Sequence, residues 1–351
     1  MNLSGKMLVL RADASATNGI GHVSRCVAFA EQWRDAGGQA VLAASGPRAA
    51  IAAMAGDLPL EWLGEARPAP DADARRFLEI AAQYGADVAL LDSYHHSLAF
   101  ESQVHARLPL VAMDDLASRA HACDLLVDTS LSAADSARYR GLVPESARLL
   151  LGTAYVVLRR PFRMQAFRER GTEPVQRLLL SFGGADPQDH STLALDSLEA
   201  PGLPPLAVDL VLSGTNPRLP GLRQRVAGMP FVQLHVDTAA MAGLMARAGL
   251  ALGSGGTTSW ERCRAGLPAL ITIVADNQLG VARTLEQAGI VRLVAADGPE
   301  NLRRAMTAAL LRALADADWR ASASRAGMAL IDGRGGDRLM AQMLPLLRST
   351  S

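Results

Sequence analysis

The stretch MLVLRADASATNGIGHVSRCVAFAEQWRDAGG, residues 7–38, indicates how the chain folds. It begins with the apolar run Met7–Ala12, which has the length and composition of a buried β-strand. A loop with Gly19 and Gly21 follows, and then an amphipathic segment that stops at Gly37–Gly38, as helices commonly do at glycine. A strand, a glycine-containing loop and a helix in this order start a βα unit, from which parallel sheets are built.

The same alternation continues along the whole chain. Apolar runs that we predict as strands recur at Ala40–Ser45, Val88–Ser93, Pro109–Asp114 and Leu125–Asp128, and in the second half at Arg177–Gly183, Val208–Gly214, Phe231–Val236, Leu250–Gly255, Ala269–Val274 and Val291–Ala296. Longer amphipathic stretches separate several of them. The sequence therefore predicts an α/β protein of two Rossmann-like, doubly wound domains facing a cleft, because open parallel sheets bind ligands at the carboxyl ends of their strands.

A polar, Arg-rich segment divides the two halves. Residues 156–175 contain no strand pattern of their own and are the predicted hinge. We accordingly expect an N-terminal domain over residues 1–158 and a C-terminal domain over residues 172–334. The last helix, within residues 335–351, has no strand after it and is expected to cross back onto the first domain.

Composition excludes several classes of protein. Apolar residues make up 49% and charged residues 20%, which is typical of a globular chain. The 35 basic and 35 acidic side chains balance, so no basic field favours nucleic acid or an anionic membrane. No apolar run is long enough to span a bilayer or resembles a signal peptide, and the distant Cys26, Cys123 and Cys263 have no zinc-ligand spacing. These features predict a soluble, cytoplasmic protein, for which a monomer is plausible.

The first strand ends in a loop that leads to His22. This histidine falls at the expected start of a helix, where the partial positive charge of the helix end disfavours imidazolium. A neutral ring could accept a proton as a general base; a packed or capping histidine is the alternative. The run reads GxGxxS rather than GxGxxG, and the strand Ala40–Ser45 does not end in an acidic residue, so dinucleotide binding is disfavoured. A later strand ends in LDSYHHS, which adds the polar residues Asp92, Ser93, Tyr94, His95 and His96 at the same predicted edge.

The second half carries a glycine-rich loop in LALGSGGTTSWERCRAG, residues 250–266. Small residues between a strand and a helix let backbone N–H groups approach an anion, and a diphosphate suits such a loop. Glu261 lies one turn into the helix expected after this loop, where it could accept hydrogen bonds from the hydroxyls of a ribose. SFGGADP, residues 181–187, is a second such loop, and the segment Ile273–Gln278 ends in amide side chains. No pattern indicates a metal ion or another cofactor.

Taken together, these segments resemble the UDP-2,4-diacetamido-2,4,6-trideoxy-β-L-altropyranose hydrolases of pseudaminic acid biosynthesis. The resemblance covers roughly residues 7–290 and rests on RADAS…GIGHVSRC, LDSY, AMDDLASRAHACDLLVD, LLLGTAYVVLRRPF, SFGGADP, GSGGTTSWERCRAGLP and ADNQ, in the order of the family. It implies a glycosyltransferase-B-like fold related to the MurG transferase. It also implies that water attacks the anomeric carbon and releases UDP with inversion, without a metal.

The resemblance further implies residue roles. His22 would be the general base, while Tyr94 and Asn277 would orient the sugar or the water. The predicted substrate-binding residues are Arg11, Asp13, Gly19, Gly21, Arg25, Ser181, Gly183, Gly184, Ser254, Gly255, Gly256, Thr257, Thr258, Glu261 and Gln278. His95 and His96 depart from the family, which commonly has glycine and an aliphatic residue there, and His95 is a second candidate base.

Other functions remain compatible with these motifs. A glycosyltransferase would pass the sugar to an acceptor hydroxyl on the same scaffold, because fold alone does not set chemistry. A hydrolase of an isomeric UDP-diacetamido sugar and a binding module without turnover are further alternatives.

Overall fold

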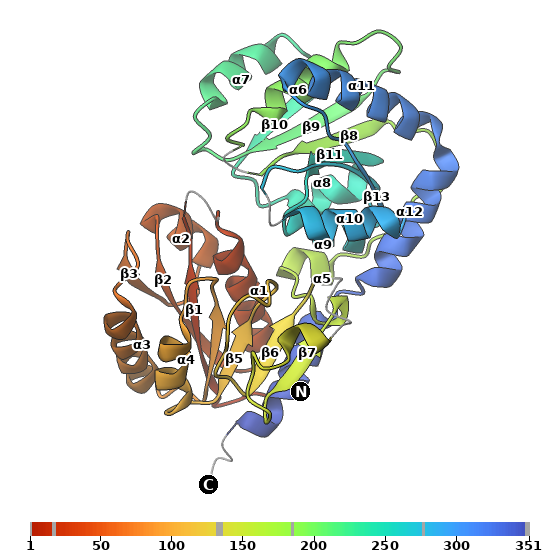
Figure 1. The fold of residues 1–351 in the computed structure, drawn as a ribbon. Coiled ribbons are helices and arrows are strands. Elements are labelled where there is room, and N and C mark those ends of the chain that lie inside the picture. Colours follow the sequence, from red (N-terminus) through yellow and green to blue (C-terminus); the bar gives the residue numbers. More distant parts are fainter. Residues whose placement is uncertain (1, 16–18, 131–135, 184–185, 276–277, 348–351) are drawn as a thin grey trace. The chain divides into compact units, whose positions relative to one another are not determined.

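The computed structural model describes residues 2–15, 19–130, 136–183, 186–275 and 278–347. The chain divides into two compact units: unit 1 comprises Met1–Arg163 and Gly333–Ser351, and unit 2 comprises Met164–Asp332 (Figure 1). No helix in the described ranges has the length and apolar character needed to cross a membrane.

Unit 1 is built on a seven-stranded sheet in which every neighbouring pair is parallel, in the order β3-β2-β1-β4-β5-β6-β7. Its strands are β1 (Met7–Asp13), β2 (Gln39–Ser45), β3 (Leu60–Gly64), β4 (Val88–Asp92), β5 (Leu110–Met113), β6 (Leu125–Asp128) and β7 (Arg148–Leu151). Its helices are α1 (Gly21–Asp35), α2 (Arg48–Ala55), α3 (Pro70–Tyr84), α4 (Leu98–His105) and α13 (Gly335–Met343), and α5 (Arg160–Met164) lies at the boundary between the units. The central strands are buried on both faces, which explains their continuous apolar runs.

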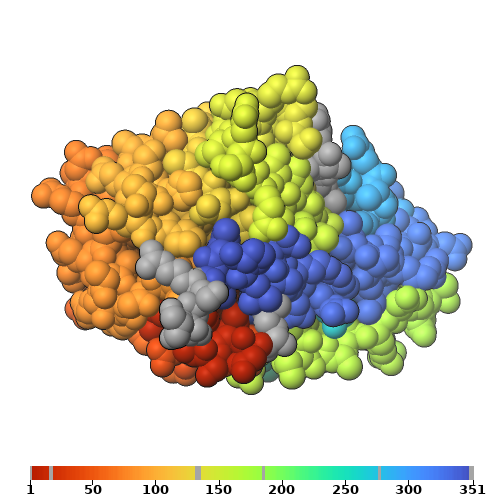
Figure 2. Space-filling model, turned by 90° about the horizontal axis from the view of Figure 1, so that it is seen from below, coloured from red at the N-terminus to blue at the C-terminus, as the bar shows by residue number. Residues whose placement is uncertain are grey.

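Helices cover both faces of this sheet (Figure 1). On one face, α1 and α13 pack over the sheet in a core that includes Phe29, Trp33 and Leu339. On the other face, α3 and α4 contribute Phe77 and Phe100 to a second core. The helix α13 thus belongs to unit 1, and Figure 2 shows this darkest blue segment beside the red residues of the N-terminus.

Unit 2 repeats the scheme with a six-stranded parallel sheet in the order β10-β9-β8-β11-β12-β13. Its strands are β8 (Arg177–Ser181), β9 (Ala207–Leu212), β10 (Val232–Val236), β11 (Leu250–Ser254), β12 (Ala269–Thr272) and β13 (Val291–Leu293). Its helices are α6 (His190–Leu198), α7 (Leu219–Ala227), α8 (Met241–Arg247), α9 (Thr258–Arg264), α10 (Leu279–Gln287), α11 (Pro299–Ala315) and α12 (Ala317–Leu330). The prediction of two Rossmann-like, doubly wound domains is confirmed.

Each sheet has one point at which the strand order reverses. In unit 1 it lies between β1 and β4, and in unit 2 between β8 and β11. The chain leaves the two strands at such a point toward opposite sides of the sheet, which opens a crevice at their carboxyl ends where ligands bind in this fold class. These two edges position the polar loops described next.

Candidate functional site

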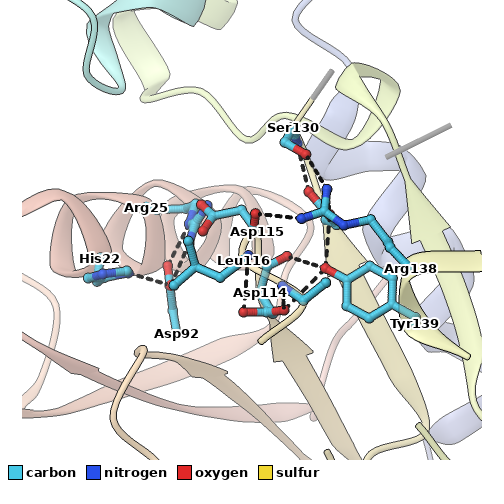
Figure 3. A network of polar contacts seen from close by, with 11 residues as sticks. His22, Arg25, Asp92, Asp114, Asp115, Leu116, Ser130, Arg138 and Tyr139 are labelled. Atoms are coloured by element: carbon cyan, nitrogen blue, oxygen red, sulfur yellow. Dashed lines mark hydrogen bonds and ion pairs between the residues drawn. The ribbon is translucent and has the colours of Figure 1, made fainter. Parts of the chain in front are cut away.

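His22 lies at the edge of unit 1 where β1 and β4 are neighbours. It is the second residue of α1, and the residue before this helix, Ile20, provides no side-chain cap. The ring is 8% exposed, and its Nδ1 lies 2.7 Å from Oδ1 of Asp92, the last residue of β4 (Figure 3). When Nδ1–H donates to this carboxylate, Nε2 is the lone-pair nitrogen that can take a proton from another group.

A second basic residue of α1 holds the other side of Asp92. Arg25 donates from Nε to Oδ2 at 2.6 Å and from Nη2 to Oδ1 at 2.6 Å. Burial alone would raise the pKa of Asp92, but the charge of Arg25 and the hydrogen bonds from Arg25 and His22 outweigh it and hold that pKa well below its usual range. Asp92 is therefore a fixed negative charge against the His22 ring. Because the guanidinium of Arg25 is engaged in these bonds, its position suits support of Asp92 better than direct contact with a ligand.

Tyr94 packs on His22 from the loop after β4. The two ring centroids lie 4.5 Å apart with the planes at 88°, an edge-to-face contact. Burial and the nearby carboxylate of Asp115 raise the pKa of Tyr94 above its usual range. The phenol therefore remains protonated near neutral pH and can donate a hydrogen bond.

The contacts of His22 belong to a longer polar network across the carboxyl ends of β4, β5 and β6 (Figure 3). Arg25 Nη1 lies 3.7 Å from Asp115 Oδ2, and the backbone carbonyl of Asp115 accepts a hydrogen bond from Arg138 Nη2 at 3.2 Å. Tyr139 in turn donates to Asp128 Oδ2 at 2.9 Å. Three neighbouring strand ends are thus tied together, which restrains the position of Asp115.

Other residues predicted at this edge lie before, within or directly after the loop that follows β1. Arg11 is fully buried, and its guanidinium bonds to the carboxylates of Asp13 and Asp73, which suits a supporting role under the loop. Gly19 has φ of +67° and closes a bridge with Ser15, and Gly21 is the first residue of α1.

The two histidines after Tyr94 differ in exposure. His95 is exposed, and its backbone N–H donates to Ser93 Oγ. His96 is 2% exposed and stacks on Phe100 with ring centroids 4.2 Å apart, so it is a core residue of unit 1.

The edge of unit 2 brings the predicted anion loops together. Ser181 and Ser254 end the neighbouring strands β8 and β11, and each is followed by its glycine-rich loop. Gly255 N–H donates to Oε1 of Gln278, which also accepts from the N–H of Val274. Gln278 thereby links the loops after β11 and β12, and the N–H of Gly255 is already engaged.

The rest of the glycine-rich segment follows in order. Gly183 has φ of +89° and is exposed, Gly256 is half-buried, and Thr257 is exposed. Thr258 begins α9, and Glu261, 7% exposed, lies in the same short helix. Two predicted residues, Gly184 and Asn277, lie outside the described residues.

Sequence reasoning named His22 but not its partner. Asp92 was predicted as a polar residue at the same edge as His22, but not as the hydrogen-bond partner of this histidine, which is 70 residues away in the sequence. The contact could have been predicted from topology, because β1 and β4 are the two neighbouring strands that flank the reversal of strand order. Within the described residues, no three or more His, Cys, Asp or Glu side chains are arranged to hold a metal ion.

A histidine held by a buried, ionised carboxylate can act as a general base. The carboxylate fixes the tautomer and stabilises the imidazolium that forms when Nε2 takes a proton. The geometry therefore suits deprotonation of water or of an alcohol at this edge.

Two curated proteins are similar in sequence, and no family model matches the chain. The spore coat polysaccharide biosynthesis protein SpsG of Bacillus subtilis is 27% identical over 207 residues, which are 58% of this chain and 60% of SpsG. The chain thus spans about three-fifths of the length of that relative. The UDP-2,4-diacetamido-2,4,6-trideoxy-β-L-altropyranose hydrolase of Campylobacter jejuni is 22% identical over 240 residues, 68% of this chain and 81% of that protein.

Solved structures match over nearly the full chain. The spinosyn rhamnosyltransferase SpnG has a TM-score of 0.68 at 16% identity, covering 96% of this chain and 99% of SpnG. Acinetobacter baumannii MurG has a TM-score of 0.61 at 14% identity over 97% and 99% of the two chains. The UDP complex of S. aureus MnaA has a TM-score of 0.66 at 11% identity over 99% of each chain. The chain therefore has the glycosyltransferase-B fold of MurG and SpnG, with both Rossmann-like domains present.

Proposed function

We propose that this chain is a metal-independent UDP-sugar hydrolase that releases UDP from UDP-2,4-diacetamido-2,4,6-trideoxy-β-L-altropyranose. The coarser part of this proposal, an enzyme of the glycosyltransferase-B type that acts on a nucleotide sugar, is supported by the fold and by both sequence relatives. The finer part is supported by the name of the Campylobacter relative and by the chemistry of the His22 edge.

The single observation that carries the proposal is the 2.7 Å contact between His22 Nδ1 and the buried Asp92 carboxylate, which supports base-catalysed attack on the sugar. In the proposed reaction, His22 Nε2 takes a proton from water while the water oxygen bonds to the anomeric carbon. The bond from that carbon to the diphosphate oxygen breaks, and its electron pair leaves with UDP. Attack from the face opposite the leaving group inverts the anomeric centre.

UDP would be held by unit 2. Its loops at Ser181–Gly183 and Ser254–Thr258 offer backbone N–H groups and hydroxyls to phosphate oxygens, and Glu261 would accept from the ribose hydroxyls. MnaA, which shares the fold, is known in complex with UDP. Tyr94 and Asn277 would orient the sugar or the attacking water.

We also place the protein in the cytoplasm. The described cysteines, Cys26, Cys123 and Cys263, are free and buried, which suits a reducing compartment.

A glycosyltransferase is the second candidate, favoured by the fold that the chain shares with SpnG and MurG. The same dyad would then deprotonate an acceptor hydroxyl instead of water. Product analysis separates the two reactions: the protein is incubated with a panel of UDP-diacetamido sugars without acceptor, and UDP and sugar are followed by NMR. A hydrolase yields UDP and the free sugar in equal amounts, initially as the inverted anomer. A transferase yields almost no UDP until an acceptor is added, and a binding module yields none under any condition.

A further inference from the structure

Unit 2 buries two arginines, Arg262 and Arg320, whose surroundings differ. Each is 3% exposed. Within the described residues, Glu261 attracts Arg262 and Asp316 attracts Arg320, but neither carboxylate is in direct ion-pair contact with that arginine. A buried guanidinium without a counter-charge is unfavourable unless other acceptors compensate it. The two residues therefore form a natural comparison.

Arg320 has the acceptors that such a group needs. Its Nη1 donates to the carbonyls of Ala313 and Leu314 at 2.7 and 2.6 Å, and Nη2 donates to the carbonyl of Glu173 at 3.2 Å. Ala313 and Leu314 lie in the last turn of α11, where carbonyl groups carry partial negative charge. Arg320 is thus a structural cap of a helix C-terminus.

Arg262 has fewer acceptors, and the carboxylate that attracts it, that of the preceding residue Glu261, is itself buried and forms no ion pair with it. Its Nη2 donates to the carbonyl of Ser254 at 2.5 Å and to Ser259 Oγ at 3.1 Å, whereas its buried Nε has no partner. Ser259 is in the first turn of α9, so the guanidinium folds back to the end of its helix that is already electropositive. Burial lowers the pKa of Arg262 to about 10, so the group still carries its charge near neutral pH.

The charge of Arg262 lies at the reversal of strand order in unit 2. An ideal Cβ on Gly253 would be 3.3 Å from Arg262 Nη1 and 2.1 Å from the carbonyl of Ser181. Gly253 therefore leaves room for the approach of β8 and β11, with the guanidinium beside their ends. A buried guanidinium that, among the described residues, has no direct ion pair and whose Nε has no partner favours the arrival of an anion at this position.

We propose that Arg262 is the buried positive charge that stabilises a diphosphate at the loops Ser181–Gly183 and Ser254–Thr258. It acts as a positioning residue, because it holds the Ser254 carbonyl and thereby the loop, while its field reaches the ligand through that loop. The identity of the ligand as a nucleoside diphosphate rests on the proposed function, whereas the burial of the Arg262 charge beside the loop is independent of it.

The test uses the full chain and separates the effect of the charge of residue 262 on UDP binding from the effect of its hydrogen bond. Arg262→Lys retains the charge, whereas Arg262→Gln retains a donor for the Ser254 carbonyl without the charge. Binding of UDP is measured by isothermal titration calorimetry, and binding of uridine, which has no phosphate, by ligand-observed NMR. Arg320→Gln is the matched control, and the thermal midpoint of each variant is recorded.

We expect Arg262→Gln to bind UDP at least about tenfold more weakly than the wild type, because a charge close to a phosphate contributes on this scale. Arg262→Lys should stay within about threefold of the wild type, and uridine binding should not change in either variant. Arg320→Gln should lower the thermal midpoint without selective loss of UDP.

Equal UDP affinities for the Lys and Gln variants, or parallel losses of UDP and uridine binding, would show that Arg262 only supports the fold and would overturn the proposal. Unchanged UDP affinity in both variants would overturn it as well. Because the titration measures binding alone, it can succeed even where hydrolysis of the UDP-sugar, and with it the proposed function, fails.

Discussion

The two oxygens of the Asp92 carboxylate have different partners. Oδ1 accepts from both His22 and Arg25, and Oδ2 accepts from Arg25 alone. A side-chain amide cannot replace this arrangement, because its NH₂ group would face a donor on one side or the other. The orientation of His22, the proposed base, and the stability of unit 1 therefore depend on the same side chain.

Asp92→Asn tests this dependence. We expect UDP release to fall by roughly 10²- to 10⁴-fold, the range for loss of general-base catalysis. The free energy of unfolding should fall by about 3–5 kcal/mol, because Arg25 loses the partner of a buried ion pair. Rates are measured below the melting temperature of the variant, and stability by urea denaturation. Asp57→Asn, which alters an exposed ion pair with Arg34, should change neither quantity; an active Asp92→Asn enzyme would contradict the assigned role.

Among the elements, the loop between β5 and β6 restrains Asp115 next to the site. Within it, His121 Nδ1 lies 3.1 Å from Glu101 Oε1 and Nε2 lies 3.6 Å from Asp114 Oδ2. The Asp114 carboxylate also accepts from the backbone N–H groups of Leu116 and Ala117. Burial lowers the pKa of His121, but the bonds to Asp114 and Glu101 outweigh it and raise that pKa above 6.5.

This raised pKa predicts a pH-dependent stability. Below the unfolded value near 6.5 the contribution of charged His121 is fully present, and it is lost as pH rises through the higher folded value. The wild type should therefore lose stability relative to His121→Asn above about pH 6.5, by at most about 1.4 kcal/mol per pH unit. Urea unfolding of both proteins between about pH 5 and 9 measures the difference. A difference that is constant or grows with pH would exclude an ionised His121 in the folded state.

The close approach of β8 to β11 at Gly253 predicts that a larger residue there lowers the stability of unit 2. In Gly253→Ala the new methyl group would meet the Ser181 carbonyl, so the strands must separate, at a cost of about 1–3 kcal/mol. Gly243→Ala is the control: Gly243 is exposed within α8 and a Cβ there meets nothing within 4 Å, so this change should be neutral or stabilising. Equal stabilities of the two variants in chemical denaturation would argue against the close approach.

Sequence patterns predicted every strand of unit 2, and in unit 1 they predicted the central strands better than the outer ones. The strands missed in unit 1 are β3 and β7, both at the edges of the sheet. All residues of β3 are only half-buried, and β7 has a single buried residue, so neither needs an uninterrupted run of fully buried apolar residues. Local motifs were enough to predict that His22 begins a helix and that Ser254 ends a strand. Contacts between distant segments, such as that of Asp92 with His22, depend on the order of the strands in the sheet. No local sequence pattern encodes this order.

At the scale of the whole molecule, two units with the same winding follow each other in one chain. Both sheets reverse between their first and fourth strands, so each half has one edge suited to a ligand. The chain returns to unit 1 after completing unit 2, and Leu339, Met340 and Met343 of α13 are buried in the core of unit 1. Stability of unit 1 therefore depends on residues at the far end of the sequence.

Leu339→Ala tests this dependence. Removing a fully buried leucine side chain should cost unit 1 about 2–5 kcal/mol. Hydrogen exchange followed by mass spectrometry should show faster exchange in β1 and α1 and unchanged exchange in β8 and β11. Leu344→Ala, at a residue that is 40% exposed, is the control and should have a much smaller effect. Uniform loss of protection in both units would mean that α13 does not belong to unit 1 alone.

The central claim is that His22, held by Asp92, takes the proton of the attacking water. The most direct measurement is the rate of UDP release from the UDP-diacetamido sugar by His22→Ala, with the affinity for UDP measured on the same preparation. The account predicts a rate lower by roughly 10²- to 10⁴-fold with nearly unchanged UDP affinity. A His22→Ala enzyme that releases UDP at the wild-type rate, or a His95→Ala enzyme that is inactive in its place, would contradict it.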